Sequence, residues 1–316
     1  MFIGTGYYTF YLKYTSPLRG FAQIGDIAPI ALCVFLAAMP EKKECKIPLV
    51  LYAIYAILGF MIGQRGALVY RSIFILAYLI YRNSTDATKE KWISKNMIRY
   101  IIISLPLLIV ALQLYGYVRE GRKMEFSSVG SSIIDFFSSI GNSSKVIKAG
   151  YDYRASFKDF KFYSLGDTLN YFKYSKLFYL FNGGNALKTQ TISYALNSHS
   201  FDSIISYLIM KRDYLAGHGA GSSYIACLFV DFGYIGIILG SFLYGILFKI
   251  ISNLDKQRWI TTAMKLYSFL FLIKAPRGSY DCFIGAIVNV TFWFTILVIY
   301  VISDSKFKKN RTNFQT

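Results

Sequence analysis

Long apolar runs, each close to the thickness of a lipid bilayer, dominate the pattern of this chain. A helix needs roughly 17–25 apolar residues to cross about 30 Å of hydrocarbon, and runs of that length recur along the sequence. Because a backbone in lipid must satisfy its polar groups within its own segment, the runs predict α-helices and not strands. We therefore predict an all-α, polytopic membrane bundle of about seven spans, over residues 21–39, 46–63, 66–81, 98–118, 224–250, 259–274 and 282–303.

One long segment separates the fourth predicted span from the fifth. Its apolar residues are scattered and largely aromatic, so we expect several short helices packed on the membrane face. Aromatic side chains bind sugar rings, and they also anchor loops at the headgroup level, so the sequence leaves both roles open. The chain divides into amino-terminal spans (1–118), this long loop (119–223), and carboxy-terminal spans with a tail (224–316).

Composition agrees with a membrane protein. Hydrophobic residues make up 54% of the chain and charged residues 16%, with a mean hydropathy of +0.40, whereas soluble domains contain about 25% charged residues. The four cysteines form no CxxC pair, so neither a disulfide framework nor a metal site is expected. The Gly-rich stretch 217–224 lacks the Gly-Lys-Ser/Thr ending of a phosphate-binding loop. We therefore expect no cofactor.

The formal net charge of +18 follows the predicted topology. Lys and Arg are concentrated in residues 40–46, 82–99, 251–258 and the tail, and seven spans put all four segments on one side. The positive-inside rule makes that side the cytoplasm, which places the carboxy terminus inside and the 119–223 loop outside. The basic residues form no element that reads DNA, which argues against a nucleic-acid partner. An anionic headgroup or a diphosphate fits the outer cations better.

Several cations are predicted to lie at the outer lip of the membrane. Arg65 occupies a short turn between two spans, and Arg119 and Arg122 lie one helical turn apart where the fourth span ends. Guanidinium groups bind phosphate oxygens in a bidentate manner, which favours a diphosphate site. The alternative is that these side chains only fix the depth of the helices. Lys274 and Arg277 add cations between the last two spans.

Two histidines and two acids are candidates for proton transfer. His199 is followed one helical turn later by Asp202, so the pair is a candidate general base and its orienting acid, with a structural histidine as the alternative. His218, in the glycine hinge, is a secondary candidate. Asp231 lies within an apolar run, where an acid is expensive unless it is paired, lines a cavity or lies at the interface.

Arg71 and Lys265 also lie within predicted spans, and we interpret both as snorkelling side chains or partners in interhelical pairs.

The main motif of this chain is GxGAGSSYIAxLFxDFGYIGIxLGSFLYG at 217–245, and it is preceded by NSHSFDSIISYL at 197–208 and by the GQRG hairpin at 63–66. These three stretches resemble the O-antigen polysaccharide polymerases (Wzy family). The long aromatic outer loop and the scarcity of acids match as well. Cys227 departs from the pattern, since an acid is expected at this position. Members also usually have more amino-terminal spans, so the resemblance implies an amino-terminally shortened member.

The resemblance implies a glycosyltransferase of the bacterial inner membrane. It would transfer a growing glycan from undecaprenyl diphosphate onto a newly arrived lipid-linked repeat unit at the periplasmic face, without metal or nucleotide. The expected partners are the lipid-linked donor and acceptor glycans, membrane lipids and a chain-length regulator protein. The arginines would neutralise the leaving diphosphate, and His199 would accept the proton of the acceptor.

Two other functions remain open. An O-antigen ligase uses the same donor with a different acceptor, and the sequence does not separate the acceptors. A polysaccharide flippase or other transporter is the alternative from a different class, although transporters usually show internal repeats and charges along a central pathway. In this chain the candidate charges gather at one face instead.

Overall fold

The computed structural model describes residues 19–61, 64–85, 91–120, 129–157, 161–174, 187–255 and 258–313. Within these ranges, the side chains of residues 19–24, 65, 117–120, 129, 132–133, 136–143 and 304–313 lie outside the described part. All regular secondary structure in the described residues is helical, which confirms the all-α part of the predicted fold class.

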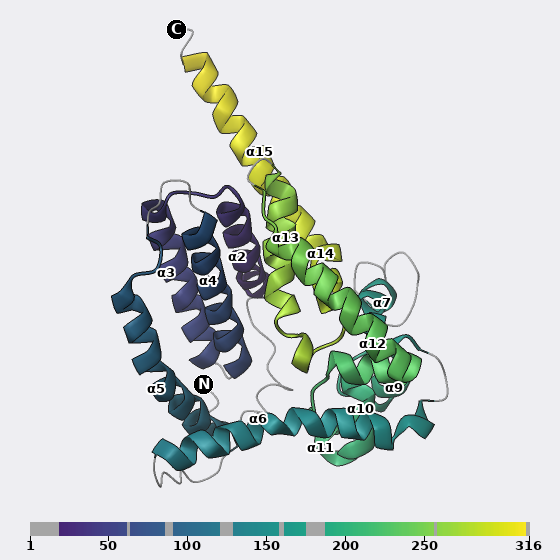
Figure 1. The fold of residues 1–316 in the computed structure, drawn as a ribbon. Helices are drawn as coiled ribbons and strands as arrows, with labels where there is room; N and C mark the ends of the chain where they lie inside the picture. Colours follow the sequence, from purple (N-terminus) through teal and green to yellow (C-terminus); the bar gives the residue numbers. More distant parts are fainter. Residues whose placement is uncertain are drawn as a thin grey trace.

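Each predicted span coincides with a helix or a helix pair (Figure 1). The amino-terminal helices are α2 (Arg19–Ala37), α3 (Lys42–Met61), α4 (Arg65–Thr85) and α5 (Lys95–Glu120). The carboxy-terminal ones are α12 (Tyr224–Ser252), α13 (Trp259–Leu272), α14 (Cys282–Val288) and α15 (Val290–Asn313).

Not all of these helices are long and apolar enough to cross a bilayer by themselves. In the described residues three are, namely Lys42–Met61, Lys95–Gly116 of α5, and α12; α14 and α15, bent by 47° at their junction, make up to four. Gly25–Ala37 and Trp259–Leu272 are apolar but shorter. The count of seven spans therefore stays a prediction.

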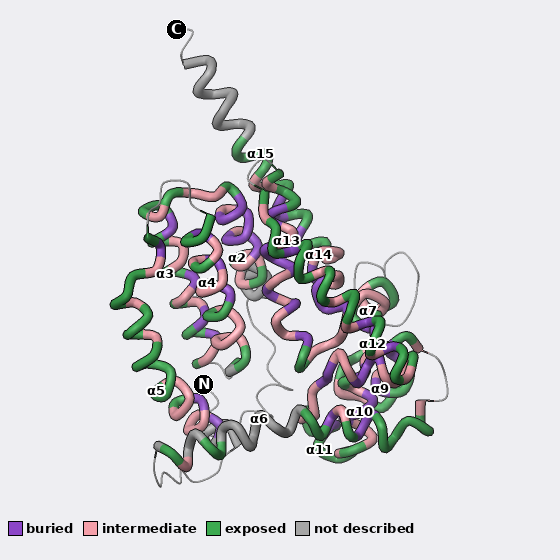
Figure 2. Tube along the Cα trace, in the orientation of Figure 1, coloured by how far each residue is buried: buried purple, intermediate pink, exposed green. Residues whose placement is uncertain are grey.

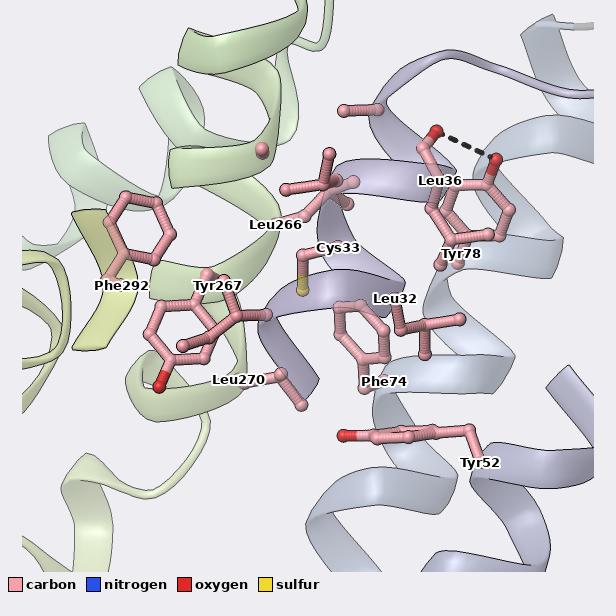
Figure 3. Packing of buried hydrophobic residues seen from close by; sticks show 14 of the residues in the cluster. Leu32, Cys33, Leu36, Tyr52, Phe74, Tyr78, Leu266, Tyr267, Leu270 and Phe292 are labelled. Carbon is pink, nitrogen blue, oxygen red and sulfur yellow. Dashed lines mark hydrogen bonds between the residues drawn. The ribbon is translucent and has the colours of Figure 1, made fainter. Parts of the chain in front are cut away.

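Helix α2 forms the centre of the bundle and packs against α13 and α15. Its buried face meets Phe74 and Tyr78 of α4 and Leu266 and Tyr267 of α13 (Figure 3). By contrast, α3, α5 and α12 expose rows of large apolar side chains, and α5 is exposed along most of its length (Figure 2). A bilayer would cover these apolar faces, which are too large to be left exposed to water.

The long loop folds into helices of its own. Its longest helix, α6 (Val129–Asp152), crosses beneath the amino-terminal helices in Figure 1. Short elements gather at one end of α6: η1 (Arg154–Ser156), η2 (Tyr163–Leu165), α7 (Gly166–Tyr174), α9 (Ile192–Asn197), α10 (Phe201–Ile209) and α11 (Lys211–Leu215). The predicted short helices are therefore present, together with one long helix that the sequence analysis did not anticipate.

Helix α12 is not one continuous helix, because Gly233 breaks it with φ 64° and ψ −152°. Only glycine adopts this backbone region readily. A Cβ at Gly240 would lie 2.6 Å from the methyl groups of Leu228, whereas twelve residues of straight helix span about 18 Å. The chain therefore folds back at Gly233. The first half packs Ala226 and Cys227 into the hydrophobic cluster of the loop.

Candidate functional site

A polar cavity of about 390 Å³ lies among α2, α3, α4 and α13 and the junction of α14 with α15. Two cations, Arg71 and Lys274, line it together with one acid, Asp26. The remaining polar lining consists of amide, hydroxyl and phenol groups, from Tyr52, Tyr55, Gln64, Tyr70, Tyr267, Asn289 and Thr291. Such a lining offers cations to an anion and hydrogen-bonding groups to a sugar.

Arg71 is held in place by α3. Its guanidinium carbon lies 4.0 Å from the centroid of the Tyr55 ring, and its Nη1 donates to the Tyr55 carbonyl oxygen at 3.3 Å. A Cβ at Gly59 would lie 2.8 Å from this Nη1, so the glycine makes room for the guanidinium. The interhelical contact predicted for Arg71 is therefore present. The side chain also lines the cavity, which the sequence analysis did not expect.

Lys274 reaches the same cavity from the end of α13. Its ammonium nitrogen lies 4.4 Å from the centroid of the Phe271 ring and 5.9 Å from that of Tyr70. Aromatic faces attract cations, so these rings fix the position of the charge. Arg277 lies on η3 (Ala275–Arg277), where it is exposed and does not line the cavity.

The buried phenol of Tyr52 contributes an unsatisfied hydroxyl to this region. Tyr52 is 4% exposed, and its hydroxyl has no hydrogen-bond partner among the described residues. A buried polar group without a partner is costly, so a water or a ligand in the cavity would stabilise it.

His199 lies between α9 and α10 and is held by α7 and by Lys161, which precedes η2. Its backbone N–H donates to Oδ1 of Asn170 at 2.9 Å, and its Nδ1 is hydrogen-bonded to the carbonyl oxygen of Lys161. A Cβ at Gly166 would collide with the carbonyl oxygen of His199, so this glycine permits the close approach. The imidazole thus has a fixed orientation.

Asp202 does not provide that orientation. Its Oδ1 accepts a hydrogen bond from the Ser206 hydroxyl at 3.2 Å, and no hydrogen bond or ion pair among the described residues joins it to His199. The Ser206 oxygen in turn accepts the backbone N–H of Ala220 at 2.9 Å, so this pair anchors the glycine hinge.

Asp202 is exposed as a residue, but protein atoms surround its carboxyl group. Burial raises its pKa above the ordinary value, and the hydrogen bond from Ser206 opposes that shift.

The acid that lies within electrostatic reach of His199 is Asp231. Its carboxylate accepts the backbone N–H groups of Tyr163 at 3.0 Å and of Ser164 at 2.6 Å, at the start of η2. Of the possibilities that the sequence left open, the structure therefore shows pairing, with backbone amides as the partners of Asp231.

Asp281 acts in the same way at the start of α7, where it accepts the N–H groups of Asp167 and Thr168 at 3.2 and 2.8 Å. Free N–H groups at a helix start require such partners. The sequence analysis missed Asp281; its only signal is an acid directly before an apolar run.

His218 lies in the hinge between Gly217 and Gly221, whose φ angles of 96° and 86° favour glycine. Its backbone N–H donates to the Asp213 carbonyl oxygen at 2.9 Å. The structure does not place His218 in the lining of the cavity.

Three predicted site arginines cannot be located in this geometry. α4 begins at Arg65 and α5 includes Arg119, but both side chains lie outside the described residues, as does the whole of Arg122. Their role in a diphosphate site stays a prediction.

Comparison with known proteins identifies one family. The family model described as O-antigen polysaccharide polymerase Wzy matches residues 1–310, almost the whole chain. No curated protein and no solved structure matches the chain.

Proposed function

Because the chain belongs to the O-antigen polysaccharide polymerase Wzy family, we propose that it joins oligosaccharide repeat units carried on undecaprenyl diphosphate. Members are multi-pass proteins of the bacterial inner membrane that take part in lipopolysaccharide biosynthesis. The proposed product is O-antigen or a related surface polysaccharide. A chain-length regulator protein is the proposed partner.

The proposed topology has seven spans, with the 119–223 loop in the periplasm and the carboxy terminus in the cytoplasm. Two observations support it: each predicted span coincides with a helix or a helix pair, and the Lys and Arg residues favour one side. In this topology Arg71 lies near the periplasmic side, six residues or about 9 Å of helix below Arg65. The cavity then lies on the same side of the membrane as the loop that carries His199, which does not itself line the cavity.

The polar cavity is the observation that carries the proposal. The two cations face a single acid, Asp26, in the described lining, and charges within a bilayer are expensive unless they are paired or serve a ligand. A diphosphate is the anion that the proposed donor supplies. Arg71 and Lys274 would neutralise it, with Arg65, Arg119, Arg122 and Arg277 as further candidates.

The reaction forms one glycosidic bond and breaks one bond to phosphate. The acceptor hydroxyl attacks the anomeric carbon of the donor glycan, undecaprenyl diphosphate leaves with the bonding electrons, and a base takes the hydroxyl proton. His199 suits the role of base: if Nδ1–H donates to the Lys161 carbonyl, Nε2 keeps its lone pair. Asp231 would then stabilise the imidazolium. Asp202 is a proposed positioning residue, through the hinge that contains His218.

The test compares Arg71→Ala and Lys274→Gln with the control Arg258→Gln in cells that make O-antigen, at equal protein levels. Arg258 is exposed and outside the cavity. Both cavity variants should leave single repeat units on lipid A and remove the long ladder, while the control keeps it. Polymer that accumulates on the lipid carrier and not on lipid A indicates a ligase. Repeat units trapped on the cytoplasmic face indicate a flippase.

A further inference from the structure

A second hollow, of about 190 Å³, lies between α4, α12 and α13. Most of its lining is apolar, with Phe74 and Ala77 from α4, Phe248 and Ile251 from α12, and Leu266 and Phe269 from α13. The one charged residue in the described lining is Lys265, whose ammonium donates to the Asn253 carbonyl oxygen. The phenol groups at its edge are already satisfied, since Tyr78 donates to the Leu36 carbonyl and Tyr81 to the Leu254 carbonyl. We call this hollow the apolar groove.

The apolar groove follows the polar cavity along the same two helices. On α4 the cavity is lined at Tyr70 and Arg71, and the groove at Phe74 and Ala77, one to two turns later. On α13, which runs the other way, the groove is lined at Leu266 and Phe269, and the cavity lining begins at Tyr267 and continues past the end of the helix to Lys274, so the two linings overlap by about one turn. The two hollows share no lining residue, but a row of packed rings connects their walls: the Phe74 ring lies 6.3 Å from the Phe269 ring in the groove and 6.1 Å from the ring of Tyr52, which lines the cavity.

We infer that the apolar groove holds the first isoprenoid units of a lipid whose diphosphate occupies the polar cavity. This inference rests on the proposed function, and it assigns the tail of the donor to a place in the fold. An amphipathic ligand with an anionic head and a hydrocarbon tail matches the chemistry of the cationic cavity and of the neighbouring groove, and it matches their order along α4. A soluble diphosphate sugar would leave the groove empty.

The length of the groove limits how much of the lipid tail it can contact. From Phe74 to Tyr81 it follows seven residues of α4, about 10 Å, so only the part of the tail nearest the diphosphate fits. Each buried methylene group is worth about fourfold in affinity. The first isoprenoid units should therefore change substrate use by tenfold or more.

The experiment uses purified protein and two synthetic donors with the same glycan and diphosphate. One carries the full undecaprenyl tail and the other a tail of a single isoprenoid unit. Ala77→Trp fills the groove, and Ala111→Trp, at an exposed position on α5, is the matched control. Wild type and Ala111→Trp should prefer the long tail at least tenfold in kcat/KM. Ala77→Trp should use both donors with the kcat/KM that the wild type has for the short-tail donor.

A long-tail preference that persists in folded Ala77→Trp overturns the inference and leaves the groove to bulk lipid. If the wild type joins neither donor, the proposed function fails instead, and the inference falls with it. A measurement on wild type guards against misfolding of the variant: a photoreactive group on the first isoprenoid unit should label peptides containing residues 74–81 and 265–269. Labelling confined to the exposed face of α5 would contradict the inference that the groove holds the tail.

Discussion

Arg71 carries most of the chemistry proposed for the polar cavity. Its guanidinium is stacked on Tyr55 and bonded to the Tyr55 carbonyl, which leaves its remaining N–H groups to the cavity. Lysine keeps the charge but has neither the planar stack nor the bidentate fork. We therefore expect Arg71→Lys to restore little of the polymer that Arg71→Ala loses, measured as ladder length on a gel. Full rescue by lysine would reduce the role of Arg71 to a point charge.

His199 is the second residue whose role can be measured directly. As general base it should contribute roughly 10²–10⁴-fold to the rate of glycosyl transfer, so His199→Ala should lose that factor while it still binds the lipid-linked glycan. Asp202→Asn should lose less, because Asp202 is bonded to Ser206 and not to the imidazole. Initial rates of glycosyl transfer at matched protein concentration show which of the two variants loses more activity. If His199→Ala keeps the wild-type rate, His218 becomes the next candidate.

The raised pKa of Asp202 gives a prediction about stability. Burial lifts this pKa above its ordinary value of 3.8, so the folded protein binds the proton more tightly than the unfolded chain does. The contribution of Asp202 to the free energy of unfolding therefore falls as pH rises from below 3.8 through the raised pKa. Asp202→Asn should remove this part of the pH dependence, seen as a flatter Tm profile above pH 3.8. An unchanged profile would show that the carboxyl is not desolvated.

At the scale of elements, the break in α12 is the feature that joins the loop to the bundle. Gly233 turns the chain two residues after Asp231, whose carboxylate accepts the backbone N–H groups at the start of η2. Gly233→Ala should destabilise the fold by about 1–3 kcal/mol because alanine is strained at this φ and ψ. Gly245→Ala is the matched control: Gly245 lies in the same helix with nothing within 4 Å of an added Cβ, so helix propensity should stabilise it by about 0.5–1 kcal/mol. Equal melting temperatures for the two variants would contradict the break.

The elements were largely predictable from sequence, whereas the site was not. Apolar runs and turn residues are local signals, and they predicted the helices that coincide with the spans: α2 to α5, α12, α13 and the pair α14–α15. Arg71 resembled a snorkelling side chain because its partner Tyr55 lies sixteen residues away on another helix. Spacing also paired His199 with Asp202, but it is tertiary packing that brings the Lys161 carbonyl to the imidazole and the Asp231 carboxylate close enough for their charges to interact.

At the scale of the whole molecule, the topology decides whether the candidate residues face the periplasm. Ala155, exposed on η1 of the loop, and Lys91, exposed before α5, should lie on opposite sides. The native cysteines are all buried, so an impermeant maleimide should label Ala155→Cys in intact spheroplasts and Lys91→Cys only after permeabilisation. The reverse pattern would put the loop, with His199, in the cytoplasm.

The most direct measurement is chain growth by the purified protein. Wild type in lipid vesicles, given undecaprenyl-diphosphate-linked repeat units and a chelator, should produce a ladder of longer lipid-linked glycans. Arg71→Ala and His199→Ala should produce none, with Arg258→Gln as the active control. If wild type moves the substrate across the vesicle bilayer and never joins two units, the protein is a transporter and the account of a polymerase is contradicted.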